Sequence, residues 1–224
     1  MKTGDFVSID YTGRVKESGE IFDVTVEETA KRENVYNPKV SYRPINIVID
    51  ANFIIKGLDD ALKEMKVGEK RTVVVEPDRG FGQRDPNFVR PIPLSNFKGE
   101  KVDPTPGSWI TINGVRGRIL SADGGRIRVD FNHPLAGKRL EYEIEVRREI
   151  TDAAEKVKAI VGYVTGLELD KIDAKLEGKE VDVKVKSEQE LPGQAKKSVA
   201  DLVMKWVAGV EKVRFVDEIG RAHV

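Results

Sequence analysis

The side chains of this chain that are placed to do chemistry are mostly apolar and aromatic. Outside a β-rich stretch in the middle, several separate segments of residues 1–150 supply candidates for the wall of one pocket. They are Tyr11, Phe22, the group Ile54, Ile55 and Leu58, then Phe81, and finally Tyr142. One carboxylate, Asp23, directly follows Phe22. It is either a partly buried carboxylate beside a pocket or a turn aspartate satisfied by backbone donors.

Other kinds of chemistry find little support in the sequence. A nucleophile needs a base within hydrogen-bond reach, but the chain has no cysteine and only His133 and His223, neither of which is well placed. The same shortage of ligands predicts no metal site, and the glycines around Phe81 do not form a phosphate-binding loop. The sequence therefore favours a chemistry that apolar walls promote without a cofactor.

The composition restricts the partners of this chain. Lys+Arg and Asp+Glu are both 38, so no global field favours nucleic acid or an anionic membrane. No apolar run approaches the roughly 18 residues that span a bilayer, and the first residues do not resemble a signal peptide. Because cysteine is absent and 34% of the residues are charged, we expect a soluble, cytoplasmic protein.

The elements that must position the pocket centre on residues 44–65. Ile45, Ile47 and Ile49 alternate as in a strand with one face in a core. Apolar residues then recur at helical spacing, at Leu58, Ala61, Leu62 and Met65. The segment between them, residues 53–58, is either a filled corner of the core or the floor of an apolar pocket. Alternation also predicts strands at residues 5–15, 70–76 and 140–146, and two helical turns fit residues 27–33.

Two further regions lie beyond this core. Prolines cluster after Phe81, and residues 107–132 suggest short strands and tight turns, with Asn113-Gly114 typical of a type I′ hairpin. From residue 150, a helix capped by Asp152, a strand, a second helix and a final strand predict a separate domain. We expect an α+β protein with a core domain at residues 1–84 and 131–149, a β-rich insert at 85–130 and an α-β-α-β domain at 150–224.

Prolyl isomerisation is a chemistry that suits apolar walls. The planar Xaa-Pro amide owes its barrier of roughly 18–20 kcal/mol to a resonance that also makes it dipolar. Rotation breaks that resonance, so the twisted amide is less dipolar and loses less on leaving water. A dry aromatic cradle around the proline ring therefore favours the twisted state over the ground state.

Four motifs, in this order along the chain, resemble the FKBP family of peptidyl-prolyl isomerases. They are Asp10-Tyr11-Thr12-Gly13, Gly19-Glu20-Ile21-Phe22-Asp23, the segment at residues 53–62, and Gly80-Phe81-Gly82. The proline-rich stretch after Phe81 and the return at Asn132-His133-Pro134-Leu135-Ala136-Gly137 resemble the SlyD-like branch, which carries a chaperone domain in its flap. The long loop before Pro44 and the C-terminal domain resemble the long archaeal members. The resemblance covers about residues 1–150.

The resemblance implies an antiparallel half-barrel sheet that wraps a short helix. It places the proline pocket at Tyr11, Phe22, Asp23, Ile45, Ile54, Ile55, Leu58, Phe81 and Tyr142. The catalytic group among these is Tyr11, Asp23, Ile55, Phe81 and Tyr142, and the Ile55 backbone N–H receives a substrate carbonyl. Leu58 departs from the tryptophan of many members, Phe81 from a tyrosine and Tyr142 from a phenylalanine. We expect these departures to moderate activity or macrolide affinity. No histidine-rich tail is present, so no nickel function is implied.

The resemblance also implies that the insert holds unfolded chains. Its client-binding side chains are expected to be Phe88, Ile92, Phe97 and Trp109. The alternative is that most of the insert's apolar residues form its own small core. The expected partners are unfolded or proline-containing polypeptides and macrolide inhibitors, with a homodimer through the C-terminal domain. Two functions stay open: an isomerase whose chaperone insert binds the unfolded chain, and a catalytically weak holdase with the FKBP fold.

Overall fold

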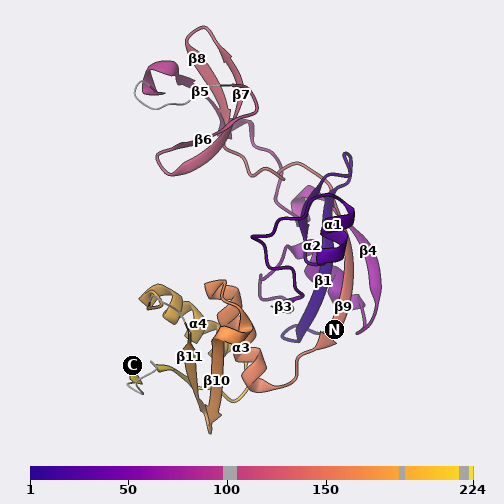
Figure 1. Cartoon of the computed structure of the whole chain (residues 1–224), viewed down its shortest axis with the longest axis vertical. Coiled ribbons are helices and arrows are strands. Elements are labelled where there is room, and N and C mark those ends of the chain that lie inside the picture. The colour runs from indigo at the N-terminus through magenta and orange to yellow at the C-terminus, as the bar shows by residue number, and fades with distance from the viewer. Residues whose placement is uncertain (98–104, 187–189, 217–221, 224) are drawn as a thin grey trace. The chain divides into compact units, whose positions relative to one another are not determined.

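The computed structural model of the 224-residue chain describes residues 1–97, 105–186, 190–216 and 222–223 (Figure 1). Contacts divide the chain into two compact units, Met1–Val75 with Glu141–Val224, and Glu76–Leu140. The described residues form three sheets, whose strands pair mainly antiparallel, together with a few helices. The mixed α+β class expected from the sequence is therefore confirmed.

The first sheet carries most of the candidate pocket. Its strands are β1 (Phe6–Val15), β2 (Ile21–Val24), β3 (Ile45–Val48), β4 (Lys70–Val75) and β9 (Leu140–Glu149). Their order is β2-β1-β9-β4, and β3 also pairs with β1. Alternate residues of a strand share a face, and Val7 and Ile9 on one face of β1 are almost fully buried. The other face of β1 is buried as well, since Phe6, Ser8 and Asp10 are 1%, 5% and 8% exposed, so the alternation marks the apolar face of this strand and not an exposed one.

Helix α2 (Lys56–Glu64) packs against this sheet by its apolar stripe. Leu58 and Leu62 on the helix are 3% and 0% exposed, and burying each stabilises the fold by about 1.5–3 kcal/mol. Gly57 is a point of close approach, because a Cβ built on it would lie 2.6 Å from Cγ1 of Val75. A side chain at position 57 would therefore push the start of the helix away from β4.

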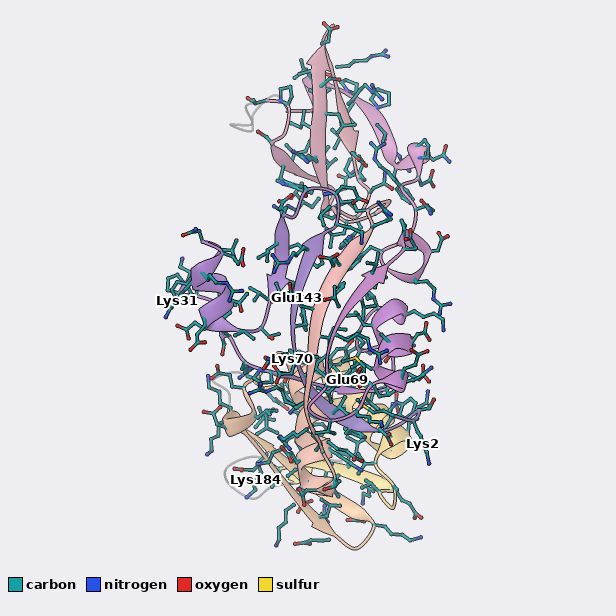
Figure 2. All side chains as sticks on the ribbon, turned by 90° about the vertical axis from the view of Figure 1, so that its right-hand side faces the viewer. Lys2, Lys31, Glu69, Lys70, Glu143 and Lys184 are labelled. Carbon is teal, nitrogen blue, oxygen red and sulfur yellow. The ribbon has the colours of Figure 1, made fainter. Side chains whose placement is uncertain are left out.

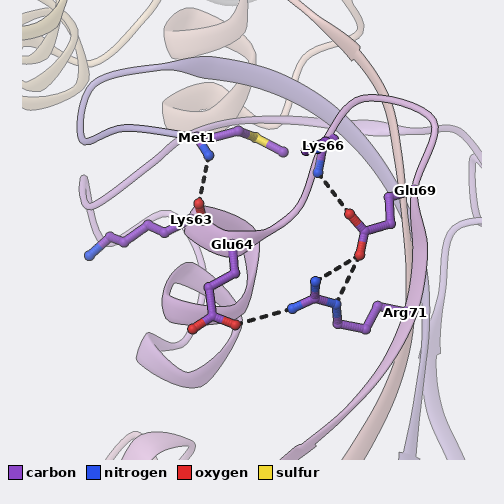
Figure 3. Close-up of polar contacts among 6 residues, drawn as sticks. All are labelled: Met1, Lys63, Glu64, Lys66, Glu69 and Arg71. Carbon is purple, nitrogen blue, oxygen red and sulfur yellow. Dashed lines mark hydrogen bonds and ion pairs between the residues drawn. The ribbon is translucent and has the colours of Figure 1, made fainter.

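Polar contacts hold the end of α2 (Figure 3). The Met1 ammonium donates a hydrogen bond to the backbone carbonyl of Lys63 at 2.7 Å, and a positive charge suits the negative end of a helix. Arg71 on β4 pairs with Glu64 at 3.2 Å and with Glu69 at 2.7 Å. These contacts fix α2 along β4, and with it the segment that leads into the helix.

The unit Glu76–Leu140 contains a second sheet with a core of its own. Its elements are η1 (Pro77–Arg79), η2 (Pro86–Phe88), β5 (Val89–Pro93), η3 (Leu94–Phe97), β6 (Trp109–Ile112), β7 (Val115–Asp123) and β8 (Arg126–Asp130). The order β5-β8-β7-β6 is antiparallel throughout. Asn113 and Gly114 have φ of 50° and 79°, which confirms the tight hairpin between β6 and β7. The buried core of this second sheet is made by Ile110, Ile119, Ile127 and Val129.

The last third of the chain forms helices on a third sheet. The elements are α3 (Ala153–Thr165), η4 (Leu169–Lys171), β10 (Ile172–Glu177), β11 (Glu180–Val185), α4 (Gly193–Trp206), β12 (Lys212–Val216) and β13 (Ala222–His223), with strand order β10-β11-β12-β13. Asp152 caps α3 by accepting from the Glu155 N–H at 2.8 Å, as expected. The expected helices and strands are present. Strand β10 is an addition, since the alternation of Ile172, Ala174 and Leu176 was not recognised.

The excursion between β2 and β3 contains α1 (Glu27–Arg32), where two helical turns were expected. A cavity of about 510 Å³ lies between α1 and the outer face of the first sheet. Figure 2 labels Lys31 on α1 and two of the residues near this cavity, Glu143 on β9 and Lys70 on β4. Because its lining is mostly charged and polar, this cavity lacks the apolar wall that the proposed chemistry needs.

Candidate active site

Four of the expected site residues contact one another on the first sheet. The Tyr11 hydroxyl on β1 donates a hydrogen bond to Oδ2 of Asp23 on β2 at 2.5 Å. The Tyr142 ring on β9 lies edge-on to two others, with centroids 5.8 Å from Tyr11 and 5.6 Å from Phe22. Edge-on aromatic pairs contribute about 0.5–1.5 kcal/mol each beyond burial. The result is one aromatic cluster with a single carboxylate attached to it.

Gly13 makes room for this aromatic cluster. A Cβ built on Gly13 would lie 2.7 Å from Cζ of Phe22 and 2.9 Å from Cε1 of Tyr142. Both separations are too short for carbon atoms in contact, so a larger residue would displace the rings. The β1–β2 register also shifts between Gly13 and Arg14. The glycine of this motif is therefore needed for close approach, not for a positive φ.

A small buried network supports the backbone beneath Tyr11, and sequence reasoning missed it. Thr25 Oγ1 donates to Asp10 Oδ1 at 2.7 Å, and the Tyr11 N–H donates to the same Thr25 oxygen at 2.9 Å. Asp10 and Thr25 are 8% and 6% exposed. Buried hydrogen bonds of this kind hold β1 and the end of β2 in one register, and so keep the Tyr11 hydroxyl within reach of the Asp23 carboxylate. A buried aspartate one residue before the tyrosine was the available signal.

Both tyrosines of the cluster are held in the neutral form. Burial is the largest cause that raises the pKa of Tyr11 well above its usual value, and the Asp23 carboxylate raises it further. The pKa of Tyr142 is raised by the same two causes in the same order. A phenol with a raised pKa keeps its proton at neutral and moderately alkaline pH. Tyr11 therefore remains a hydrogen-bond donor to Asp23 over that range.

The expected pocket floor leads into α2 on the same unit. Ile54 and Ile55 are half-buried, and Ile55 is the N-cap residue of α2, with extended φ and ψ of −65° and 148°. Its carbonyl accepts the N–H groups of Leu58 and Asp59 at 3.0 and 3.2 Å, which starts the helix. Ile45 is half-buried on β3 and pairs with Ile9, two residues before Tyr11 on the same face of β1.

Phe81 lies in the other unit, just after η1. Its ring stacks on the imidazole of His133 with centroids 4.3 Å apart and planes 2° apart. His133 Nδ1 accepts the Leu135 N–H at 3.1 Å, which orients the imidazole. Sequence reasoning found no well-placed histidine and so missed this contact. The signal was the Asn132-His133-Pro134 turn itself, whose histidine meets the glycine-flanked phenylalanine only after folding.

The expected client-binding residues of the insert have different surroundings. Phe88 and Trp109 are 48% and 40% exposed, and the Arg116 guanidinium lies 4.6 Å from the Trp109 ring centroid. Ile92 is partly buried against the insert's core. Phe97 ends η3, and its side chain lies outside the described structure. Some of the insert's apolar residues therefore form its own core, while Phe88 and Trp109 face solvent.

Among residues 1–97, 105–186, 190–216 and 222–223, no three carboxylate, histidine or cysteine side chains gather as a metal site. Within the same ranges, no helix is long and apolar enough to cross a bilayer.

Comparisons with known proteins agree with the resemblance seen in the motifs. A family model described as FKBP-type peptidyl-prolyl cis-trans isomerase matches residues 1–147, and a model described as FKBP26 C-terminal matches residues 153–220. A short-type peptidyl-prolyl cis-trans isomerase of Methanocaldococcus jannaschii is 35% identical over 147 residues, which are 66% of this chain and 92% of that protein. The SlyD isomerase of Helicobacter pylori is 29% identical over 124 residues, which are 53% of this chain and 67% of that protein. The first family model matches well over half of the chain, and the protein therefore belongs to the family of FKBP-type peptidyl-prolyl cis-trans isomerases.

Proposed function

We propose that this protein accelerates cis–trans isomerisation of Xaa-Pro bonds in unfolded or partly folded polypeptides. The observation that carries the proposal is the Tyr11–Asp23 hydrogen bond within the aromatic cluster of Phe22 and Tyr142. Family membership supplies the reaction class, and the cluster supplies an apolar site where a proline ring can be held. No covalent intermediate or cofactor enters this reaction.

The Tyr11–Asp23 pair acts on the change in charge distribution during rotation. In the twisted amide the nitrogen no longer shares its lone pair, so the carbonyl carbon becomes electron-poor. A carboxylate fixed beside that carbon stabilises the twisted state more than the planar state. Because Tyr11 stays protonated and donates to Asp23, the carboxylate keeps one orientation through the reaction.

The floor is proposed to hold the proline ring and the adjoining carbonyl. The half-buried Ile54 and Ile55 offer apolar surface for the ring, whereas Leu58 is 3% exposed and its contact with the ring stays a prediction from its motif. The Ile55 N–H is placed at the start of α2, where helix N–H groups point outward and the partial charge is positive, so it suits a substrate carbonyl oxygen. The place of Phe81 in the pocket stays a prediction that rests on its motif.

We also propose that the insert binds the client. Phe88 and Trp109 support this role because large apolar side chains 48% and 40% exposed on a small β-sheet are a surface that an unfolded chain can cover. Ile92 contributes less, because it packs partly into the insert's core. The role proposed for Phe97 rests on the sequence alone.

The test measures isomerisation of an alanyl-prolyl-phenylalanine peptide by the wild type and by Asp23→Asn and Tyr11→Phe. The uncatalysed step takes about 10–100 s at 25 °C, so acceleration is easily seen. We expect Asp23→Asn to lower kcat/KM about 10- to 100-fold, mainly through kcat, because the carboxylate acts on the twisted state. Tyr11→Phe should lower it less, since the carboxylate remains.

Asp123→Asn is the matched control, an exposed carboxylate on the insert that is far from the cluster in sequence and is expected to leave the rate unchanged. If Asp23→Asn and Tyr11→Phe both retain the wild-type rate, the aromatic cluster is not the site of reaction.

A catalytically weak holdase is the second candidate. Phe81 lacks the hydroxyl usual at its position, and Leu58 lacks the tryptophan ring of many family members, so the proposed pocket has fewer contacts for the substrate. Suppression of aggregation with no acceleration of either the peptide or a proline-limited refolding reaction would favour the holdase. Macrolide binding, a homodimer through the C-terminal domain and a cytoplasmic location stay predictions.

A further inference from the structure

Helix α3 contacts the floor loop, residues 50–53, which directly precedes the proposed pocket floor. The Tyr163 ring on α3 stacks on Phe53 with centroids 3.7 Å apart and planes 9° apart. Its hydroxyl also donates to the backbone carbonyl of Asn52 at 3.3 Å. Phe53 is directly followed by Ile54 and Ile55, so one side chain from the C-terminal third contacts two consecutive residues of the floor loop.

The floor loop has a conformation that needs outside support. Asp50 and Asn52 are not glycines, yet their φ values are 62° and 60°, in the left-handed region that non-glycine residues rarely adopt. On one side the loop is held from within the isomerase part, since Asp59 Oδ1 accepts the Asp50 N–H at 3.1 Å and Lys63 pairs with the Asp50 carboxylate at 2.6 Å. On the other side the described contact is Tyr163.

A cavity beside the Phe53–Tyr163 stack indicates that the floor loop depends on this stack for support. A mostly apolar cavity of about 280 Å³ lies beside it, lined by Ile45, Ile47 and Phe53 from the isomerase part and by Ala159, Leu167 and Leu169 from the C-terminal part. Packing is therefore incomplete next to the stack. Nearby, Arg43 and Glu168 form an ion pair at 3.4 Å across the same boundary.

Phe53 and Tyr163 differ in exposure, and the difference indicates which depends on the other. Phe53 is 8% exposed, while Tyr163 is 48% exposed, so one face of the tyrosine ring covers the phenylalanine and much of the rest meets water. Removing the tyrosine ring would uncover Phe53 without opening a hole in a filled core. Its main consequence would be a freer floor loop.

We propose that Tyr163 is a positioning residue for the isomerase site, acting through the stack of its ring on Phe53 to hold the adjoining Ile54 and Ile55. The inference rests on the proposed function, because it needs that floor to hold the proline ring. It assigns the C-terminal helix α3 a part in substrate binding. A floor that is held in place binds proline equally in the planar and twisted states, since the ring itself does not change during rotation, so the effect belongs in KM.

The experiment compares full-length Tyr163→Ala, Tyr163→Phe and Tyr36→Ala in peptide isomerisation. Tyr36 is a matched control, because it is 42% exposed and also stacks on another ring, that of Tyr42, outside the floor loop. We expect Tyr163→Ala to raise KM about three- to tenfold with kcat within about twofold of wild type, the size expected for losing one aromatic pair. Tyr163→Phe keeps the stack and should restore a near wild-type KM.

A KM for Tyr163→Ala equal to that of Tyr36→Ala would overturn the proposal, as would an equal loss in Tyr163→Phe. The double variant Phe53→Leu with Tyr163→Ala adds a check, because two residues acting through one contact should be non-additive. Additive losses would count against the coupling. Asp23→Asn separates the two ideas: if it lowers kcat while Tyr163→Ala is silent, only the positioning role fails, and if neither has an effect, the proposed site fails.

Discussion

The isomerase sheet and the insert sheet present aromatic side chains in opposite ways. On the isomerase sheet, Tyr142 is 4% exposed and two other rings lie edge-on to it at fixed angles of 60° and 80°. On the insert, Trp109 is 40% exposed and has the cationic Arg116 against its ring. One sheet locks its rings among neighbours, and the other leaves them open to solvent.

This difference matches the two tasks proposed for the two sheets. Catalysis by differential binding requires groups held in one geometry, because an adaptable pocket would fit the planar and twisted amides equally well. Capture of unfolded chains requires the reverse, since clients differ in sequence and a surface must accept many of them. The contrast predicts that changes to each sheet affect peptide catalysis and client refolding separately.

Two glycine substitutions, one in each sheet, should show the largest difference between the sheets. Gly13→Ala would place a methyl 2.7 Å from Phe22, and Gly117→Ala would place one 2.5 Å from Cγ1 of the buried Val129 in the insert. Each should cost about 1–3 kcal/mol of stability in its own sheet through overpacking. We expect Gly13→Ala to reduce isomerisation of the peptide about tenfold or more, through disturbed rings. Gly117→Ala should leave the peptide rate unchanged and reduce only catalysed refolding.

The measurement is peptide isomerisation beside refolding of a proline-limited protein, with thermal unfolding as a check. Gly124→Ala is not a suitable control, because its φ of 56° would add strain. Gly193, with no atom within 4 Å of an added Cβ and no positive φ, is a better one. Equal losses of peptide activity in Gly13→Ala and Gly117→Ala would contradict the separation.

Truncating the exposed insert side chains should have a smaller effect, and it should lower catalysed refolding without lowering isomerisation of the peptide. We expect Phe88→Ala with Trp109→Ala to lower catalysis of refolding about three- to tenfold and leave the small peptide unaffected, because the peptide is too short to need capture. Val115→Ala is the control, since Val115 is 53% exposed on the same sheet but small. A loss of peptide activity in the double variant would mean that these side chains serve the reaction itself.

The smallest expected difference between the two sheets is in how their free energies of unfolding depend on pH. The folded-state pKa of Tyr142 is raised, first by burial and then by Asp23, while an unfolded tyrosine titrates near pH 10. The unfolded state therefore loses its proton first. Above about pH 10 the free energy of unfolding falls with a slope of up to about 1.4 kcal/mol per pH unit for this residue.

Urea unfolding at pH 9 and pH 11 measures this slope, which Tyr142→Phe should reduce. The unit Glu76–Leu140 contains no tyrosine, so its unfolding should lack this contribution. An unaltered slope in Tyr142→Phe would mean that the buried phenol does not control alkaline stability.

Several features could be predicted from local sequence because their causes are local. The Asn113-Gly114 hairpin follows from two neighbouring residues that tolerate positive φ, and the start of α3 follows from Asp152 three residues before the N–H that it accepts. Strand alternation predicted the apolar face of β1, but the polar face with Ser8, Asp10 and Thr12 is buried too, because other elements of the fold cover it. Strand β10 was missed although its alternation is clear, because its charged partners in the sequence resembled a loop.

Periodicities, turns, caps and family motifs could all be predicted from the sequence, since each depends on residues a few positions apart. Three contacts became visible only in the folded protein: Tyr11 donates to Asp23, Phe81 stacks on His133 and Tyr163 covers Phe53. These contacts join residues from different elements, up to 110 positions apart in the chain for Phe53 and Tyr163. They depend on strand register, helix position and side-chain packing, and no local pattern specifies where two distant elements will meet.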